Sequence, residues 1–390
     1  MIIFEEAYKL VINSAVKVEN EYVDLNNSLN RILAKDVISD VNSPPFDKSA
    51  MDGYACRRED IHNELQIIEV IPAGIVPEKR IEKNLCSKIM TGAMVPDGAD
   101  CVLMVEYTED ISKNKIKFIK ESTKNNIAYA TEDVKQGDIV LKKGTKIKAQ
   151  HIAVMATTGY IKPLVAKKVR VGIISTGNEI VEPNIKPGLS QIRNSNAYQL
   201  IAQVEQAGAI PDYIGIAKDD KESSYKLIVD AFSRNQLVLL TGGVSMGDFD
   251  FIPDILDDLN IDIKFKTIAI QPGKPTVFGI KGNQFVFGLP GNPVSSFNIF
   301  ELLVKPFLNK MMGANFYPVE IKMPLGKEYK RKKSLRKSFI PIKISNGNVW
   351  PLEYHGSAHI FSFSEADGII SIPVGKTIIK KGEIVDVRQI

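Results

Sequence analysis

The chain has 390 residues, 44% hydrophobic and 25% charged, which is the balance of a globular protein with room for two to four domains. Its 50 basic and 46 acidic residues leave a net charge of +4, too weak a bias for a nucleic-acid-binding surface. Three cysteines without a CxxC pair argue against a disulfide framework and against a zinc site. No apolar run approaches the roughly 20 residues of a membrane span, and the first residues lack a signal-peptide pattern, so we expect a cytoplasmic protein without a membrane partner.

The first part of the chain combines two helical patterns with a β-rich stretch. Apolar spacing predicts an amphipathic helix over residues 4–16, and a second helix over residues 149–158. Because so short a first helix needs packing to persist, the second is a candidate partner, which would make the first domain discontinuous. Between them, short runs at 67–71, 101–105 and 115–119 are separated by prolines and glycines. This pattern of short runs between prolines and glycines predicts an inserted antiparallel β domain.

From Lys168 onward, apolar strand patterns alternate with helical ones. The expected order is strand 169–175, a helix capped by Asn194 or Ser195 and ending before Gly208, strand 213–217, helix 222–233, strand 236–241, strand 284–288 and helix 294–312. Such alternation predicts βαβ units and a doubly wound, mostly parallel sheet. After Gly313 the pattern is strand-like to the end, which predicts a small separate β domain.

The loops after these strands are suited to an anion. In an open α/β sheet, ligands bind beyond the carboxyl ends of the strands. Gly242 and Gly243 let backbone N–H groups approach a ligand, and Ser245 and Ser295 add hydroxyl donors near helix starts. Lys274 supplies a point charge suited to an oxyanion. Other candidate residues of the same loops are Ser175, Thr176, Gly273, Pro275, Pro290 and Pro293.

Three carboxylates fall in the same loops. Glu179, Asp219 and Asp250 would surround an anion, which is unfavourable unless a hard cation lies between them, so Mg²⁺ is implied. Each piece alone is more readily a turn or a helix cap than a binding residue, but five such loops at one sheet edge favour an anionic ligand site. The sequence contains neither a Walker A loop nor a cysteine or histidine nucleophile arrangement.

Two segments of the β-rich region, far along the chain from these loops, are rich in small and polar residues. Residues 44–55 (PPFDKSAMDGYA) hold Asp47 and Asp52, and residues 89–100 (IMTGAMVPDGAD) hold Thr91. Small and polar residues dominate both, as in ordered loops. Alone, each segment is a structural turn.

Taken together, these motifs resemble those of the MoeA family of molybdopterin molybdenumtransferases, which includes the gephyrin E domain. The motifs occur in order along the chain: PPFDKSAMDGYA, IMTGAMVPDGAD, TEDVKQGD, ISTGNE, TGGVSMGDFDF, QPGKP and LPGNPVS. The resemblance covers essentially the whole chain, and TGGVSMGDFDF and LPGNPVS are its most specific parts.

The resemblance implies an elongated homodimer of four-domain subunits. The domains would be residues 1–26 with 42–53 and 141–168 (helical, discontinuous), 27–41 with 54–140 (β-rich, inserted), 169–313 (MogA/MoaB-like α/β) and 314–390 (β-barrel-like). The active cleft would lie between the third domain of one subunit and the β domains of the other. This would explain why Asp47, Asp52, Thr91 and Asp133 lie so far along the chain from the sheet edge.

The resemblance also implies roles. Glu179, Asp219, Ser245 and Asp250 would hold the pterin phosphate, the nucleotide and Mg²⁺. Lys274, Pro275 and Ser295 would frame molybdate, with Arg336 (in RKSFIP) and Ser357 (in HGSAH) facing it. The implied reaction converts adenylyl-molybdopterin and molybdate to molybdenum cofactor and AMP, with a MogA-like adenylyltransferase as a possible partner.

The sequence departs from the family pattern at two places. Gln271 stands where the family often has lysine before PGKP, and Ala128 and Thr131 stand where arginine and glycine are usual. A tungstate-preferring insertase therefore remains an alternative. So do a non-catalytic scaffold protein of the same fold and an enzyme of the preceding adenylating step.

Overall fold

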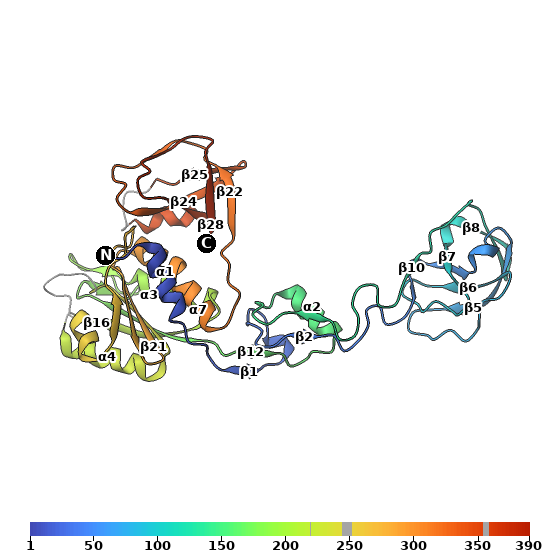
Figure 1. Cartoon of the computed structure of the whole chain (residues 1–390), viewed down its shortest axis with the longest axis horizontal. Coiled ribbons are helices and arrows are strands. Elements are labelled where there is room, and N and C mark those ends of the chain that lie inside the picture. The colour runs from blue at the N-terminus through green and yellow to red at the C-terminus, as the bar shows by residue number, and fades with distance from the viewer. Residues whose placement is uncertain (219, 244–251, 354–358) are drawn as a thin grey trace.

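The computed structural model describes residues 1–218, 220–243, 252–353 and 359–390, and its regular structure is dominated by three six-stranded sheets. Two of the sheets lie together at one end of an elongated molecule, and the third lies at the far end of an arm (Figure 1). No helix of the described part of the chain is long and apolar enough to cross a membrane.

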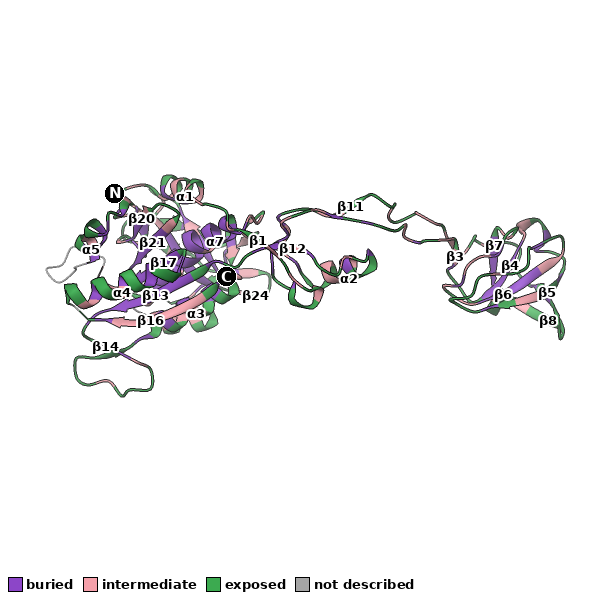
Figure 2. Cartoon of the chain, turned by 90° about the horizontal axis from the view of Figure 1, so that it is seen from below, coloured by how far each residue is buried: buried purple, intermediate pink, exposed green. Residues whose placement is uncertain are grey.

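The central sheet has helices on both faces. In spatial order its strands are β16 (Ile210–Ala217), β13 (Arg170–Thr176), β17 (Leu237–Thr241), β21 (Gln284–Leu289), β20 (Val277–Lys281) and β18 (Asp262–Phe265). The first four strands are parallel, and β20 and β18 form an antiparallel edge. The inner strands β13 and β17 are buried apart from Arg170 at the start of β13 (Figure 2), as expected of strands covered on both faces.

One core cluster forms on each face of this sheet. The helices α3 (Ser195–Gln206), α6 (Pro293–Ile299) and α7 (Lys305–Met311) bury apolar residues on one face. The other face is covered by α4 (Lys221–Arg234) and α5 (Ile252–Asp258). This doubly wound arrangement confirms the predicted fold class of a multidomain protein with a mostly parallel α/β sheet and further β domains.

The helix predicted over residues 294–312 is built of three pieces. Between α6 and α7 lies a π-helical turn, Phe300–Val304. Pro306 has no N–H to donate to the carbonyl of Leu302, so the regular α-helical ladder cannot continue through this point. The apolar periodicity is unaffected by this change, which is why the sequence predicted one helix.

The first helix packs against the central domain rather than against the second helix. In α1 (Phe4–Asn13), Ala7 and Val11 are fully buried in the core cluster that also contains α3 and α7. The candidate partner, α2 (Ala149–Thr157), belongs to a different cluster with Leu33 and Val37. The expected α1–α2 pairing is therefore wrong, because the chain leaves the central domain only after α1 is complete.

A narrow neck joins the central domain to the arm. It is the antiparallel pair β1 (Asn20–Tyr22) and β12 (Leu164–Ala166), in which Asn20 lies opposite Ala166 and Tyr22 opposite Leu164. Beyond it lie α2, the 3-10 turn Leu25–Asn27 and the short pair β2 (Val37–Ile38) and β11 (Ile139–Leu141). The pair β3 (Lys48–Ser49) and β10 (Ile127–Ala128) then leads to the distal sheet (Figure 1).

The distal sheet carries its own small core. Its strands, in spatial order, are β7 (Cys101–Met104), β4 (Gly53–Cys56), β6 (Leu85–Ile89), β5 (Glu64–Ile71), β9 (Lys115–Phe118) and β8 (Thr108–Ser112). All neighbours are antiparallel except β5 and β6, which are parallel, so the prediction of a purely antiparallel domain is wrong at that pair. The three cysteines are buried and unbridged in this sheet.

The C-terminal sheet is docked on the central domain. Its strands are β19 (Ile270–Gln271), β24 (Lys337–Ser345), β25 (Asn348–Pro351), β26 (Gly368–Ile372), β28 (Ile384–Gln389) and β22 (Glu320–Pro324), with the separate pair β23 (Tyr329–Lys330) and β27 (Ile378–Ile379) beside it. Phe363, in the 3-10 turn Ile360–Glu365, packs edge-on against Phe297 of α6, with ring centroids 5.1 Å apart. The guanidinium of Arg388 donates to the carbonyl of Glu301 at 2.6 Å.

Candidate functional site

The carboxyl ends of the parallel strands are level with one another. Thr176 at the end of β13 lies opposite Ala217 of β16, and Thr241 at the end of β17 lies opposite Leu289 of β21. The loops that follow these residues therefore emerge at one edge of the central sheet. Binding sites of open α/β sheets occur at this edge.

The Gly242-Gly243 turn lies directly on the end of β13. Both glycines have positive φ, +89° and +61°, and a Cβ on Gly242 would lie 2.5 Å from the carbonyl oxygen of Thr176. No other residue fits this backbone without movement. The side chain of Thr176 is 6% exposed and its hydroxyl donates to the carbonyl of Thr241 at 3.4 Å, so this threonine forms the base on which the turn rests.

Ser175 bonds the end of β13 to the start of α3. Its hydroxyl is buried and donates to Asn194 Oδ1 at 2.9 Å. The same oxygen accepts from the N–H of Ala197, which caps α3 as the sequence predicted. The start of α3 is thereby fixed to β13.

Glu179 is the one predicted magnesium ligand that lies within the described residues. Its exposed carboxylate lies over Gly177, where a Cβ would be 2.4 Å from Glu179 Oε2. No lysine or arginine of the described part of the chain forms a salt bridge with it. Asp219, Ser245 and Asp250 lie outside the described residues. Within those residues no group of three or more potential ligands is assembled.

The turn before α6 forms the next part of the edge. Pro290 is buried. Pro293 is the first residue of α6, a position whose N–H has no acceptor within the helix, so proline loses no hydrogen bond there. Ser295 is 3% exposed in the first turn of this helix. The predicted order of strand, turn and helix is confirmed here.

The loop 271–275 connects the central domain to the C-terminal sheet. Ile270 and Gln271 pair in parallel with Lys337 and Ser338 of β24. Gly273, at φ +116°, is packed so closely that a Cβ would lie 2.8 Å from Ile299 Cδ1 of α6. Thr276 donates its hydroxyl to the carbonyl of Gly273 at 2.7 Å, which tightens the turn.

One cationic residue lies in this loop, and a second bonds to the backbone directly before it. Lys274 is exposed, and Pro275 beside it is half-buried. Arg336 precedes β24 and donates from Nη1 to the carbonyl of Ile270 at 3.1 Å. Lys274 and Arg336, 62 residues apart in the chain, therefore belong to one loop cluster. Ser357 lies outside the described residues.

Asp52 and Thr91 meet in the arm. Asp52 Oδ1 accepts from the N–H of Thr91 at 2.6 Å and from its hydroxyl at 2.8 Å. These two hydrogen bonds, the backbone one first, hold the pKa of Asp52 below its usual value. The carboxylate is therefore firmly ionised and remains exposed.

The other two predicted arm residues lie in neighbouring loops. Asp47 Oδ1 accepts from the N–H of Ala130 at 2.7 Å. Asp133 is exposed, and its backbone N–H donates to the carbonyl of Ser43 at 3.0 Å. All four arm residues lie far from the edge of the central sheet within one chain (Figure 1).

Asn196 is a site residue that sequence reasoning missed. From the first turn of α3 its Nδ2 donates to Thr241 Oγ1 at 2.8 Å and to the carbonyl of Gly291 at 2.8 Å. Its position two residues after the helix cap was the available signal, since the start of α3 lies at the same sheet edge.

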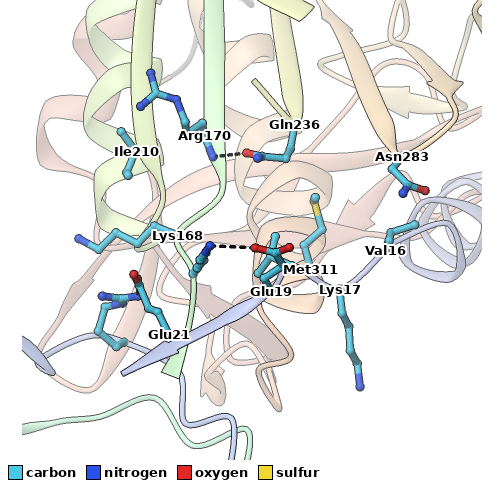
Figure 3. Close-up of a pocket in the computed structure, with 13 residues that line it drawn as sticks. Val16, Lys17, Glu19, Glu21, Lys168, Arg170, Ile210, Gln236, Asn283 and Met311 are labelled. Atoms are coloured by element: carbon cyan, nitrogen blue, oxygen red, sulfur yellow. Dashed lines mark hydrogen bonds and ion pairs between the residues drawn. The ribbon is translucent and has the colours of Figure 1, made fainter. Parts of the chain in front are cut away.

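A cavity of about 600 Å³ lies at the opposite edge of the sheet, between the neck and the starts of the strands (Figure 3). Arg170, at the start of β13, and Gln236 line it from the central domain. Lys167 pairs with Glu19 at 2.8 Å across the neck, so part of the positive charge that lines the cavity is neutralised by this ion pair. This cavity contains none of the predicted site residues.

The fold and site define a multidomain protein built around a doubly wound α/β sheet, with candidate binding loops at the carboxyl edge of that sheet. Three family models match the chain in order: the MoeA N-terminal region (domain I and II) at residues 2–159, a probable molybdopterin binding domain at 172–310 and the MoeA C-terminal region (domain IV) at 322–390. The chain belongs to the MoeA family.

Relatives and solved structures agree with this assignment. A molybdopterin molybdenumtransferase of Staphylococcus epidermidis is 38% identical over 98% of this chain and 94% of its own length. The corresponding protein of Staphylococcus aureus is 34% identical over the same shares. The crystal structure of a molybdopterin biosynthesis MoeA protein from Pyrococcus horikoshii OT3 matches with a TM-score of 0.86 at 31% identity, covering 100% of both chains.

Proposed function

We propose that this protein is a molybdopterin molybdenumtransferase, which inserts molybdate into adenylyl-molybdopterin and releases AMP. The observation that carries the proposal is the convergence of the Gly242-Gly243 turn, Ser295 and the loop of Lys274 at the carboxyl edge of the central sheet. Family membership and the relatives named molybdopterin molybdenumtransferase support the same activity.

Each part of the edge has a distinct task in this proposal. Backbone N–H groups of the glycine turn bind the phosphates, since they donate where negative charge gathers, and the hydroxyl of Ser295 helps to frame molybdate. Lys274 and Arg336 attract and orient the molybdate dianion. A preorganised set of donors stabilises charge as the phosphoanhydride opens, and no protein nucleophile is required.

Magnesium is part of the proposal. Glu179, with Asp219 and Asp250, would hold Mg²⁺, which would neutralise the phosphates beside these carboxylates. The exposed position of Glu179 at the sheet edge, free of lysine and arginine partners in the described residues, supports its part.

A homodimer is also proposed. Asp47, Asp52, Thr91 and Asp133 lie on the arm, at a distance that one chain does not bridge (Figure 1). A second copy, related by a two-fold axis, would bring its arm to this chain's sheet edge and complete two equal sites. A MogA-like adenylyltransferase would supply the adenylylated substrate.

The test is AMP release from adenylyl-molybdopterin with Mg²⁺, with and without molybdate or tungstate. Release that depends on an oxyanion is expected, and the preferred oxyanion decides whether Gln271 marks a tungstate-preferring insertase. Release with neither oxyanion, despite tight pterin binding, would favour the scaffold alternative. Adenylation of molybdopterin from MgATP would instead assign the preceding step.

Lys274→Ala tests the oxyanion role. Loss of a charge-assisted contact should lower kcat/KM for molybdate by about tenfold or more. Lys281→Ala, which removes an exposed lysine at the far end of β20, is the matched control. Equal losses of molybdate use and pterin binding in Lys274→Ala would count against the assigned role.

A further inference from the structure

The amide of Asn196 joins two loops of the site. Thr241, one of its acceptors, ends β17 directly before the Gly242-Gly243 turn, and Gly291, the other, lies in the turn before Ser295. These loops approach closely: a Cβ on Gly291 would lie 3.6 Å from the Cα of Gly242. One side chain therefore sets the spacing between the loop assigned to the phosphates and the loop of Ser295, which is assigned to molybdate.

The acceptors fix which way the amide points. The carbonyl of Gly291 can only accept, so the Asn196 atom that faces it must be Nδ2. Both Nδ2 hydrogens are then used. The remaining Oδ1 is buried, and no group in the described residues donates to it.

An amide with an unpaired buried oxygen is a poor choice for packing alone. A buried acceptor without a donor costs free energy. Leu200, one turn further along α3, fills its position with an apolar side chain and is fully buried. The amide at position 196 is therefore explained by what its two N–H groups hold.

The first turn of α3, which carries Asn196, is held firmly on the sheet. Asn194 caps α3, accepts from Ser175 of β13 and donates to Tyr213 of β16, so the first turn of the helix cannot shift on the sheet without breaking two hydrogen bonds. A side chain on a fixed helix start transmits its geometry to the loops it contacts. Asn196 thus links three elements, α3, β17 and the turn before α6.

We propose that Asn196 is a positioning residue of the transferase site. It holds the turn at Gly291 against the end of β17, and so keeps Ser295 and the Gly242-Gly243 turn at the spacing that molybdate and the phosphates of the pterin substrate require together. The inference rests on the function proposed above.

The kinetic test compares Asn196→Ala and Asn196→Asp with Gln199→Ala. Gln199 is the control because it lies one turn along the same helix and, among the described residues, also has a buried unpaired oxygen and donates to Gln203 rather than to a loop of the site. Misplacement of a binding loop should lower kcat for AMP release by about tenfold or more, with a smaller change in KM. Asn196→Asp should be impaired at least as much, since a carboxylate would face the Gly291 carbonyl.

Hydrogen exchange in the same variants gives a readout that does not depend on turnover. Amides in residues 237–243 and 289–296 should exchange faster in Asn196→Ala and remain unchanged in Gln199→Ala. Unchanged exchange there, or kinetics within about twofold of the unaltered chain, would overturn the proposal. If the unaltered chain releases no AMP, the proposed function fails, whereas the exchange result still decides whether Asn196 holds the two loops.

Discussion

The carboxylate of Asp52 depends on Thr91 for its low pKa. Because two hydrogen bonds favour the ionised form, the interaction stabilises the fold above the ordinary pKa of an aspartate, about 4. This contribution is lost as the pH falls through the lowered pKa. Loss of the Asp52–Thr91 interaction is therefore one cause of the fall in the free energy of unfolding at acid pH.

Thr91→Val should raise the pKa of Asp52 part of the way to its usual value. The rise is partial because the backbone donor, the larger cause, remains. The measurement is a carbon-13 NMR titration of the Asp52 carboxyl. Thr108→Val, in the same distal sheet but bonded to Val105, should leave that titration unchanged, and an unaltered Asp52 in Thr91→Val would refute the assignment.

Thr131 occupies a backbone conformation that suits glycine. Its φ is +67°, in the left-handed region where a β-branched side chain is strained. The sequence showed this threonine as a departure from the family's usual glycine, and the structure supplies the physical reason for that glycine.

Thr131→Gly should therefore stabilise the chain, by about 1 kcal/mol after the entropy cost of glycine is subtracted. Urea unfolding of the two proteins measures the difference. The same change at Thr108, where φ is −126°, should destabilise instead. Destabilisation at both positions would mean that the strain at Thr131 is negligible.

The elements themselves were largely predictable, and their long-range partners were not. The buried run of β13 and the cap of α3 follow from local patterns, and both are confirmed. The parallel pairing of β19 with β24, which brings Arg336 to the loop of Lys274, joins residues far apart in the chain and has no local signal. The same limit applies to Asn196 and to the packing of α1.

One aromatic cluster fixes α7 on the central sheet. Phe307 is fully buried, and its ring centroid lies 5.9 Å from that of Phe278 and 4.8 Å from that of Phe285, both edge-on. These rings join β20, β21 and α7. The helix that follows the LPGNPVS turn is therefore held at its far end by aromatic packing.

Phe307→Ala should cost about 3–5 kcal/mol of unfolding free energy, since it leaves a cavity among the rings. Guanidinium unfolding followed by circular dichroism measures it. Phe361→Ala removes the same side chain from a position that is 89% exposed and should change stability by less than about 0.5 kcal/mol. Similar effects of the two changes would contradict the packing argument.

At the scale of the whole molecule, the two groups of site residues predict complementation between subunits. Asp52→Ala disables the arm and Lys274→Ala disables the sheet edge, so each variant alone should be nearly inactive. After subunit exchange, a mixture should recover up to about a quarter of the unaltered activity, since half of the dimers are mixed and each contains one intact site.

The control for this mixture pairs two arm variants, Asp47→Ala and Asp52→Ala, each of which removes a carboxylate assigned to the site. Both defects then lie on the arm, and no mixed dimer has an intact site. Recovery in this control, or none in the first mixture, would show that the arm and the edge do not combine across subunits.

The neck has a further consequence for the modularity of the chain. Tyr22 of β1 and Leu164 of β12 are opposite partners in an antiparallel pair, so the arm leaves and re-enters within one strand spacing, about 5 Å. An Asn-Gly turn in place of residues 23–163 would therefore close the ribbon as a hairpin. The excised chain would lose Ile32 from the central core but keep α1, the whole central sheet and the docked C-terminal sheet. The arm is in this sense an insertion that can be removed, and its excision would leave a shorter protein in which the carboxyl edge of the central sheet is intact.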